Sequence, residues 1–410
     1  MSKIYLVKLT PVDKFFFGGE ITFTRDFNNR DKESRKLSAD EKELRKFDEE
    51  YSSYVVKSNL FPQQTSLLGM FRFLLLSNSD KSVFSNNKIQ SREEAKKIIG
   101  PGSFLIDSNN YDRMDFGKIK SLSPCFIRRK ASGKDWENIF CAPLDKELNV
   151  RFDAGDVILN EEKSFIPYIT YKKMKDNKVL MFNQKDGLQS LYIGDKGLIL
   201  NEEDLFIEDA RIGIDRNFDG KTQEGAFYKQ ISYRLTNKLE ISENKYETHE
   251  LHFALYIEVA DDCSLPEKYI VSIGGDNSQF TFESQLIETQ EDSKIGYLYP
   301  VDSDDFDCYS KVVLMSDAFI DTKKLSSCIF AINETIPFRF LVSDITTQDY
   351  YKFSGKSHLK RSEEKYNLYK RGSVFYFESD KQLALFETAL NEKYRFCQIG
   401  YNHYKSIIKK

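Results

Sequence analysis

The chain has 410 residues, with 60 Lys and Arg, 64 Asp and Glu, and a formal net charge of −4. At about 150 residues per domain, this length predicts two or three domains. Its 33 Phe, 23 Tyr and 1 Trp exclude a disordered or fibrous chain. The chain has no net positive charge that would indicate nucleic-acid binding, so any basic surface must be local. No run approaches the roughly 18 apolar residues of a membrane helix, so we expect no membrane partner.

The N-terminal segment and the cysteines indicate the compartment. Residues 4–10 read as a first strand, and Lys8 interrupts the apolar run that a secretory signal requires. The six cysteines include no CxxC pair, which argues against a zinc site and a compact disulfide framework. We therefore expect reduced thiols, a cytoplasmic location, and neither a metal nor another cofactor.

The predicted elements begin with a charged insertion. Residues 25–50 hold eight basic and nine acidic residues and few apolar ones, so we expect a solvated segment there. A proline and hydroxyl residues then precede a dense apolar run at 61–72, which predicts a helix. Residues 380–394 place their apolar side chains mainly on one face and predict a second helix.

Most of the chain between these helices reads as short strands, separated by Gly, Asn, Asp and Pro. The predicted strands are 228–235, 252–259, 269–273, 279–283, 310–314 and 373–378. The fold class is therefore α+β, richer in strand than in helix. We place an N-terminal domain at 1–150, a connecting segment at 151–210 and a C-terminal domain at 211–410.

Several short motifs resemble catalytic or metal-binding sites but lack residues that those sites require. Residues 274–277 read GGDN, and an amide stands where palm-type polymerases and cyclases have a second carboxylate. Their alternating flanks predict a hairpin turn. Residues 302–307 lack the EF-hand glycine and predict an acidic loop. His249 and His252 would point to opposite faces of a strand, which excludes a metal pair there.

A metal-independent ribonuclease stays open as an alternative function. Such an enzyme needs only a general base, a general acid and a cation near the scissile phosphate. His358 lies among lysines, and His403 lies close to Tyr401 and Lys405. A surface histidine without a catalytic role explains each of them more simply, so we expect no catalytic residue.

Positive side chains gather in three segments despite the negative net charge. The first is 118–134, and the second, 352–371, holds seven Lys and Arg plus His358 against two acidic residues. The last 18 residues hold five basic side chains, no acid and several aromatics. Cations neutralise phosphates and aromatic faces stack on unpaired bases, so this mixture favours single-stranded RNA.

The start of the first predicted helix is a further candidate anion site. Free backbone N–H groups and the positive end of the helix dipole favour phosphate there. Thr65 and Ser66 begin the helix, and Gln63, Gln64 and Arg72 are positioned to help grip the anion. An ordinary cap on a core helix explains the same residues equally well.

Segments spread along nearly the whole chain share their order with a known family. They are LTPVD at 9–13 with FFGG at 16–19, FPQQTSLLGMFR at 61–72, GPGSFLI at 100–106, RIGID at 211–215 with 222–228, and FSGK at 353–356 with RGSVFYF at 371–377. Together they resemble the third-subunit family of the Cmr complex, the type III-B CRISPR effector. This family is part of the RAMP superfamily and is similar to the Cas group-five proteins.

The resemblance implies two ferredoxin-like, RRM-type domains with β-hairpin elaborations, and a non-catalytic scaffold. Such subunits hold the repeat-derived 5′ tag of the crRNA. They join the large cyclase/polymerase-like subunit to the backbone RAMP subunit, and they meet target RNA through the complex. A counterpart from a closely related type III subtype would share this mechanism and differ in its partners. The resemblance also implies that, if the ribonuclease alternative holds, its substrates are guide-RNA precursors, as for some relatives in the superfamily.

The residues expected to contact RNA come from the basic segments, the helix start and the segments that resemble the family. They are Lys14, Phe17, Gln63, Gln64, Thr65, Ser66, Arg72, Arg128, Arg129, Lys130, Arg211, Lys356, His358, Arg361 and Arg371. No metal-binding residue is expected.

Overall fold

The computed structural model describes most of the chain. The described residues are 2–19, 21–24, 53–104, 115–159, 162–172, 179–183, 185, 187–216, 222–242, 245–287, 309–339, 341–342, 360–361 and 365–408. The insertion predicted at 25–50, the acidic loop at 302–307, Lys356 and His358 lie outside these residues.

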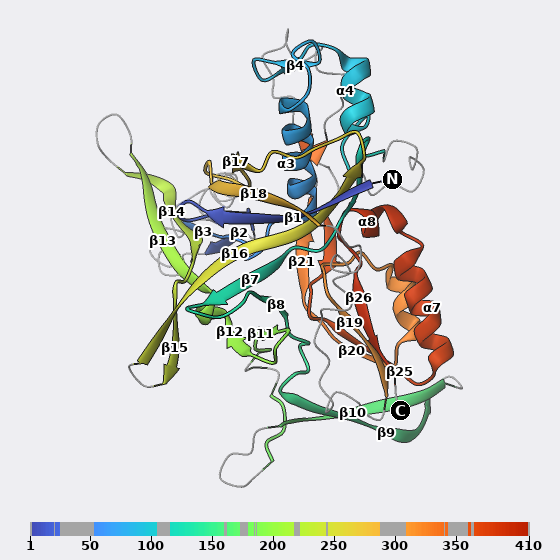
Figure 1. The fold of residues 1–410 in the computed structure, drawn as a ribbon. Helices are drawn as coiled ribbons and strands as arrows, with labels where there is room; N and C mark the ends of the chain where they lie inside the picture. Colours follow the sequence, from blue (N-terminus) through green and yellow to red (C-terminus); the bar gives the residue numbers. More distant parts are fainter. Residues whose placement is uncertain are drawn as a thin grey trace, which may run out of the picture.

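The largest sheet has ten strands and joins segments that are far apart in the sequence. Its main path runs β12-β11-β8-β7-β16-β1-β18-β17, and β6 and β15 also pair with β16 (Figure 1). The strands are β1 (Ser2–Pro11), β6 (Ile119–Leu122), β7 (Phe126–Ala131), β8 (Glu137–Cys141), β11 (Leu191–Gly194), β12 (Ile199–Asn201), β15 (Lys238–Ser242), β16 (Lys245–Ala260), β17 (Lys268–Ser272) and β18 (Gln279–Ile287). Strands from residues 1–150 and 211–410 thus share one sheet, and the division into two ferredoxin-like domains stays a prediction.

The two faces of this sheet pack on different cores, because successive side chains of a strand point to opposite faces. In β1, Val7 and Leu9 belong to the main core, whereas Leu6 belongs to a second core. Helix α3 (Gln64–Ser77) covers the main-core face with Leu67, Leu68, Phe71, Leu74 and Leu75. Burial of each such side chain stabilises the fold by about 1.5–3 kcal/mol.

The second core lies between the large sheet and a C-terminal sheet. The C-terminal sheet has the order β20-β25-β19-β26, and α7 lies against it (Figure 1). Its elements are β19 (Ser310–Leu314), β20 (Phe330–Ile332), β25 (Val374–Phe377), β26 (Tyr404–Ile407), α7 (Asp380–Asn391) and α8 (Tyr394–Gln398). In β19, Val312 and Leu314 pack with α7, whereas Val313 belongs to the second core.

The remaining elements elaborate these layers. β13 (Phe206–Arg216) and β14 (Thr222–Leu235) form a hairpin in the sheet β13-β14-β3-β2, and β9 (Leu148–Leu159) and β10 (Glu162–Tyr171) form another (Figure 1). The other elements are β2 (Ile21–Thr24), β3 (Ser53–Lys57), β4 (Phe84–Ser85), β5 (Lys88–Ile89), α4 (Arg92–Ile99), η3 (Glu202–Asp204), η6 (Thr322–Ser327), β21 (Thr335–Phe338), β22 (Leu341–Val342), β23 (Lys360–Arg361) and β24 (Tyr366–Tyr369).

The structure confirms the α+β class and the main predicted elements. The predicted helices correspond to α3 and α7, and the six predicted strands overlap β14, β16, β17, β18, β19 and β25. The turn predicted at 274–277 connects β17 to β18, with Gly274 at φ +88°. The amide of Gly275 donates to the Phe16 carbonyl at 2.7 Å, so this motif is a packed turn.

The described residues also bear on membrane crossing and metal binding. Among these residues, no helix is both long and apolar enough to cross a membrane. Within the same part of the chain, no group of three or more His, Cys, Asp and Glu side chains is placed to hold a metal ion.

Candidate nucleic-acid interface

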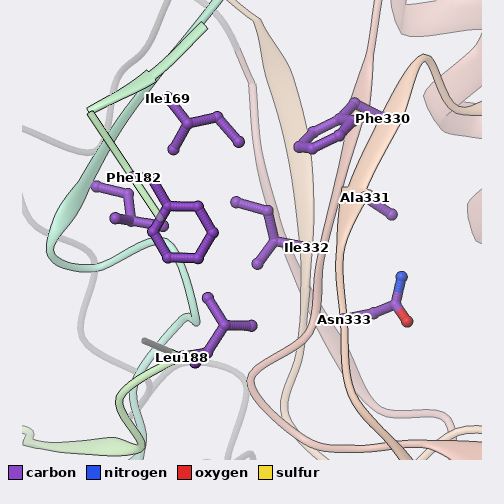
Figure 2. Close-up of a pocket in the computed structure, with 9 residues that line it drawn as sticks. Ile169, Phe182, Leu188, Phe330, Ala331, Ile332 and Asn333 are labelled. Atoms are coloured by element: carbon purple, nitrogen blue, oxygen red, sulfur yellow. The ribbon is translucent and has the colours of Figure 1, made fainter. Parts of the chain in front are cut away.

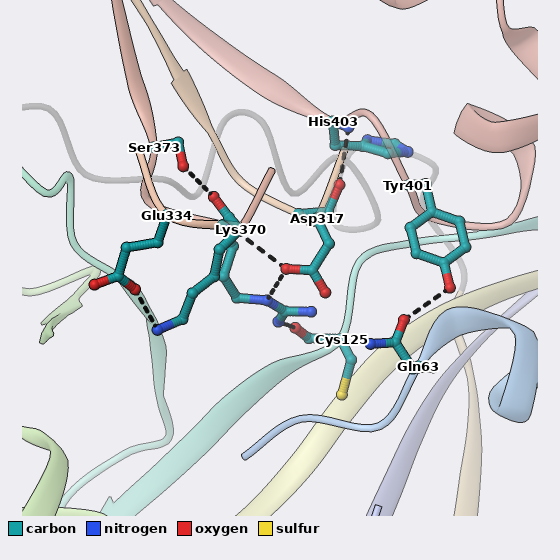
Figure 3. A network of polar contacts seen from close by, with 10 residues as sticks. Gln63, Cys125, Asp317, Glu334, Lys370, Ser373, Tyr401 and His403 are labelled. Carbon is teal, nitrogen blue, oxygen red and sulfur yellow. Dashed lines mark hydrogen bonds and ion pairs between the residues drawn. The ribbon is translucent and has the colours of Figure 1, made fainter. Parts of the chain in front are cut away.

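The start of helix α3 is occupied by contacts within the protein. The side chain of Gln64 is buried, and its Nε2 donates to the Ser123 carbonyl at 2.9 Å. The Tyr401 hydroxyl donates to Gln63 Oε1 at 3.0 Å (Figure 3). A Cβ on Gly400 would lie 1.7 Å from Gln64 Nε2. Of the residues expected to grip an anion, Gln63 therefore binds Tyr401 of the C-terminal segment, and Gln64 binds Ser123 and lies against Gly400.

The other predicted residues of α3 differ in exposure. Thr65 is half-buried and Ser66 is exposed. Arg72 Nη2 donates to the Asp115 carbonyl at 3.3 Å, and its guanidinium lies 5.7 Å from the centroid of the Phe116 ring. Burial lowers the pKa of Arg72 to about 10. Of this group, Ser66 is the most accessible.

Arg371 lies in the protein interior, at the junction of the two main sheets. Its guanidinium is 4.2 Å from the centroid of the Phe61 ring, and Nη1 donates to the Cys125 carbonyl at 2.8 Å. Arg371 Nε lies 3.4 Å from Asp317 Oδ1 (Figure 3). Burial is the largest single effect and lowers the pKa of Arg371, but the combined effect of Asp317, Cys141 and Cys125 is larger, so the pKa is raised. The structure thus gives this cation internal partners instead of a surface position.

Arg129 and Lys14 are also paired within the protein. Arg129 is 4% exposed; its Nη2 lies 2.7 Å from Glu247 Oε2, and its Nε donates to His249 Nδ1 at 3.2 Å. Lys14 Nζ lies 2.9 Å from Asp209 Oδ1. A cation with a carboxylate partner and little exposed surface has little capacity left for phosphate, so the interface proposed below omits both residues.

Phe17 and Arg211 have opposite environments. Phe17 is buried and stacks on Phe280, with ring centroids 5.6 Å apart. It is a core side chain, so the interface below omits it. Arg211 is exposed on β13. Arg361 belongs to the short strand β23.

A different arrangement surrounds Trp136, the single tryptophan of the chain. Three cationic groups lie close to the centroid of its ring: Lys8 Nζ at 5.3 Å, the Arg128 guanidinium at 5.3 Å and Lys130 Nζ at 5.7 Å. The ring of His252 packs on Trp136 with centroids 4.4 Å apart. We refer to these five residues as the Trp136 cluster.

The sheet register explains why these side chains meet. His252 of β16 pairs with Arg128 of β7. Lys8 of β1 pairs with Ala254, two residues further along β16 and therefore on the same face. Ala254 belongs to the second core, so the Trp136 cluster continues the face of the large sheet that carries this core. Trp136 directly precedes β8.

The electrostatics of the Trp136 cluster are unbalanced. Within the part of the chain that the structure describes, no carboxylate forms an ion pair with Lys8, Arg128 or Lys130. Burial, together with Lys8 and Arg128, lowers the pKa of His252 to about 3, so its imidazole is neutral near pH 7. Burial also lowers the pKa of Arg128. The cluster thus has positive charge that the described residues do not neutralise.

An apolar cavity of about 270 Å³ lies elsewhere, between β20 on one side and Ile169, Phe182 and Leu188 on the other (Figure 2). Ile169, Phe182, Leu188 and Phe330 are among its lining residues, and Asn333 is the polar side chain there. This lining has no cation for a phosphate, so the cavity is not a candidate for nucleic acid.

The comparison with protein families covers most of the chain. A family model described as CRISPR-associated protein (Cas_Cmr3) matches residues 42–408. The chain belongs to this family. Membership in the Cmr3 family indicates a subunit of the CRISPR Cmr complex and confirms the resemblance drawn from the sequence. A search among curated proteins finds no match.

In this Cmr3-family chain, His403 and Tyr401, two of the residues considered for the ribonuclease alternative, have internal contacts. His403 Nε2 lies 2.9 Å from the Cys397 carbonyl oxygen, and burial lowers the pKa of this histidine. Tyr401 is 1% exposed. The described geometry therefore does not favour the alternative.

Three members of the Trp136 cluster, namely Lys8, Trp136 and His252, were not among the residues expected from the sequence to contact RNA. A signal for Trp136 was present, because Lys130 and Trp136 flank a Ser-Gly turn in a short alternating stretch and so point to one face of a hairpin. No local signal identifies Lys8, because only the pairing of β1 with β16 brings it near.

Proposed function

We propose that this chain is a non-catalytic, guide-RNA-binding scaffold subunit of a type III-B CRISPR effector, which serves antiviral defence. It holds the 5′ tag of the crRNA and joins the large cyclase/polymerase-like subunit to the backbone RAMP subunit. Target RNA reaches it through the assembled complex. Membership in the Cmr3 family supports the place in the complex.

The observation that carries RNA binding is the Trp136 cluster. Lys8, Arg128 and Lys130 surround an aromatic ring without carboxylate partners among the described residues. Proteins that bind single strands combine such cations for the backbone with aromatic rings for the bases. RRM-type domains use a sheet face in this way, which fits the position of the cluster on the large sheet.

A second observation supports the scaffold role. Exposed apolar side chains gather on β10 and on the segment beside it, where Thr170 bridges to Met181. They are Ile166, Tyr168, Val179, Leu180 and Met181, each 41–54% exposed. Contiguous exposed apolar surface marks sites of protein contact, as expected for a subunit that joins two others.

The test is to purify the tagged protein from its native host at low salt concentration and to identify the RNA and proteins that accompany it. We expect short RNAs with one constant 5′ sequence, together with a large cyclase/polymerase-like subunit and a backbone subunit. A protein that carries neither RNA nor partners would contradict the proposal.

A second assay tests the non-catalytic assignment. We expect a labelled repeat RNA to remain intact with the purified chain in EDTA. Cleavage that disappears in a His403→Ala variant would instead establish the ribonuclease alternative. His403→Gln is the matched control, because it retains a polar group of similar size that can bond to the Cys397 carbonyl.

A further inference from the structure

Three cations converge on one side of the large sheet, and none of them forms an ion pair with a carboxylate of the described residues. The charge of Asp195 acts on Arg128 without forming an ion pair with it. Two carboxylates face them across the sheet register: Glu250 opposite Lys130 and Glu283 opposite Lys8. Neither forms an ion pair with its opposite lysine, and Glu283 lies 3.0 Å from Lys268 Nζ. Like charges held this close repel one another in the free protein. An anion bound among them would remove that repulsion.

The polar atoms of the cluster also have unused hydrogen-bonding capacity. Arg128 Nε and His252 Nε2 are buried and have no hydrogen-bond partner among the described residues. His252 is 4% exposed and packs directly on the indole. Buried polar groups without partners are uncommon in folded proteins. This observation does not depend on the absence of ion pairs, and it indicates that the cluster is incomplete without a ligand.

The aromatic ring restricts the kind of anion. Trp136 is half-buried, so part of the indole is open to solvent beside the cations. An acidic peptide would supply negative charge but no planar group beside each charge. A nucleotide supplies both a phosphate and an adjacent planar base, and a base stacks well on an aromatic ring.

We propose that the Trp136 cluster is a binding site for one unpaired nucleotide, whose phosphate lies among Lys8, Arg128 and Lys130 and whose base contacts Trp136. The inference rests on the proposed function, because it assigns this nucleotide to a bound single-stranded RNA. A free nucleoside monophosphate offers the same chemistry, and the experiment separates the two sources.

The single tryptophan makes the site directly observable, because all tryptophan emission of the purified full-length chain comes from Trp136. The emission is followed during separate titrations with inorganic phosphate, adenosine monophosphate, a short oligoadenylate and a polyglutamate peptide. We expect the oligoadenylate to quench the emission at concentrations at least about tenfold below those of the mononucleotide, because neighbouring phosphates add contacts. Phosphate and polyglutamate should leave the emission unchanged.

Variants test the individual cations. Arg128→Gln and Lys130→Gln should each weaken quenching by the oligoadenylate about tenfold and reduce the slope of log affinity against log salt by about one. Lys134→Gln is the matched control, because Lys134 belongs to the same hairpin but pairs with Glu247 at 3.1 Å. Its affinity should stay within about twofold of the unaltered chain.

A second measurement does not depend on the emission. The anisotropy of a labelled oligoadenylate reports binding when Trp136 is replaced. Trp136→Phe should bind within about threefold of the unaltered chain, whereas Trp136→Ala should bind about tenfold more weakly, because stacking is lost. Equal affinities for the Ala and Phe variants, with both variants folded by their thermal unfolding, would overturn the stacking role.

The outcomes also separate this inference from the proposed function. Binding of RNA by anisotropy without quenching of Trp136 would overturn the inference and leave the proposed function standing. Absence of RNA binding in both measurements would contradict both proposals. Quenching by the mononucleotide, with no gain for the oligoadenylate, would leave a nucleotide site that does not serve RNA. Quenching by polyglutamate as strong as that by the oligoadenylate would overturn nucleotide recognition.

Discussion

Two regions of the molecule place a guanidinium group against an aromatic ring, and they differ in what neutralises the cation. Arg371 lies 4.2 Å from the Phe61 ring and is paired with Asp317. Arg128 lies 5.3 Å from the Trp136 ring and has no carboxylate partner among the described residues. A cation beside an aromatic ring is therefore not by itself a sign of binding. The presence or absence of a carboxylate separates a structural contact from a candidate site.

The largest predicted loss of stability comes from removing the contact between Arg371 and Asp317. Arg371→Met leaves Asp317 buried without its partner, so we expect the free energy of unfolding to fall by about 3–5 kcal/mol. Denaturant unfolding measures the change. Arg128→Met is the matched control and should cost less than about 1 kcal/mol. Equal losses in both variants would remove the distinction between the two regions.

The second prediction concerns the contact of the C-terminal segment with α3. Gly400 has φ +91°, and an added Cβ would lie 1.7 Å from Gln64 Nε2. Gly400→Ala should destabilise the fold by about 3 kcal/mol, because strain and crowding act together. Gly197→Ala is the control, with φ +84° but no atom within 4 Å of the added Cβ, and should cost about 1 kcal/mol. Equal changes in the thermal midpoint would show that crowding contributes nothing.

The third prediction uses the pH dependence of the Trp136 cluster. The pKa of His252 is lowered from 6.5 to about 3 in the folded state. As the pH falls below 6.5, the unfolded chain therefore takes up a proton that the folded chain does not, and stability is lost until the pH reaches about 3. At about pH 5 this loss amounts to about 2 kcal/mol.

His252→Phe keeps a ring beside Trp136 and removes the titrating group. We expect the decrease in unfolding free energy between about pH 7 and about pH 5 to be about 2 kcal/mol smaller in this variant. Urea unfolding at the two pH values measures it. An unchanged decrease would mean that His252 is protonated in the folded protein, which would contradict its burial among cations.

The smallest predicted effect concerns an exposed ion pair. Lys97 Nζ lies 2.7 Å from Glu94 Oε1 on α4, and both side chains are more than half exposed. Lys97→Ala should change the free energy of unfolding by about 0.5 kcal/mol or less, because water competes with the pair. A loss comparable to that of Arg371→Met would show that burial does not determine how much an ion pair stabilises this protein.

The elements were predictable from the sequence because their signals are local. The apolar side chains on one face of α7 and the short apolar runs of β19 and β25 specify these elements within a few positions. The resemblance to the Cmr3 family was likewise carried by short segments and is confirmed by the match over 42–408.

The roles of individual basic residues were not predictable in the same way. Arg128, Arg129 and Lys130 are consecutive cations, yet the alternation of β7 turns Arg129 toward Glu247 and the other two toward Trp136. Which face is buried depends on strands far away in the sequence. Arg371 was expected to contact RNA, but it pairs with Asp317. This partner is distant in the sequence and is identified only in the folded protein.

The position of β1 has a consequence for the synthesis of this protein. β1 is made well before its partners: it pairs on one side with β16, where Ser2 faces Ala260, and on the other side with β18, where Ile4 faces Ile287. Both edges of β1 therefore stay open until more than half of the chain has been made. Contacts between such distant segments form slowly, and open strand edges invite aggregation. Ribosomes that stop early would release a chain that is prone to self-association, so a chaperone that shields β1 would raise the yield of folded protein.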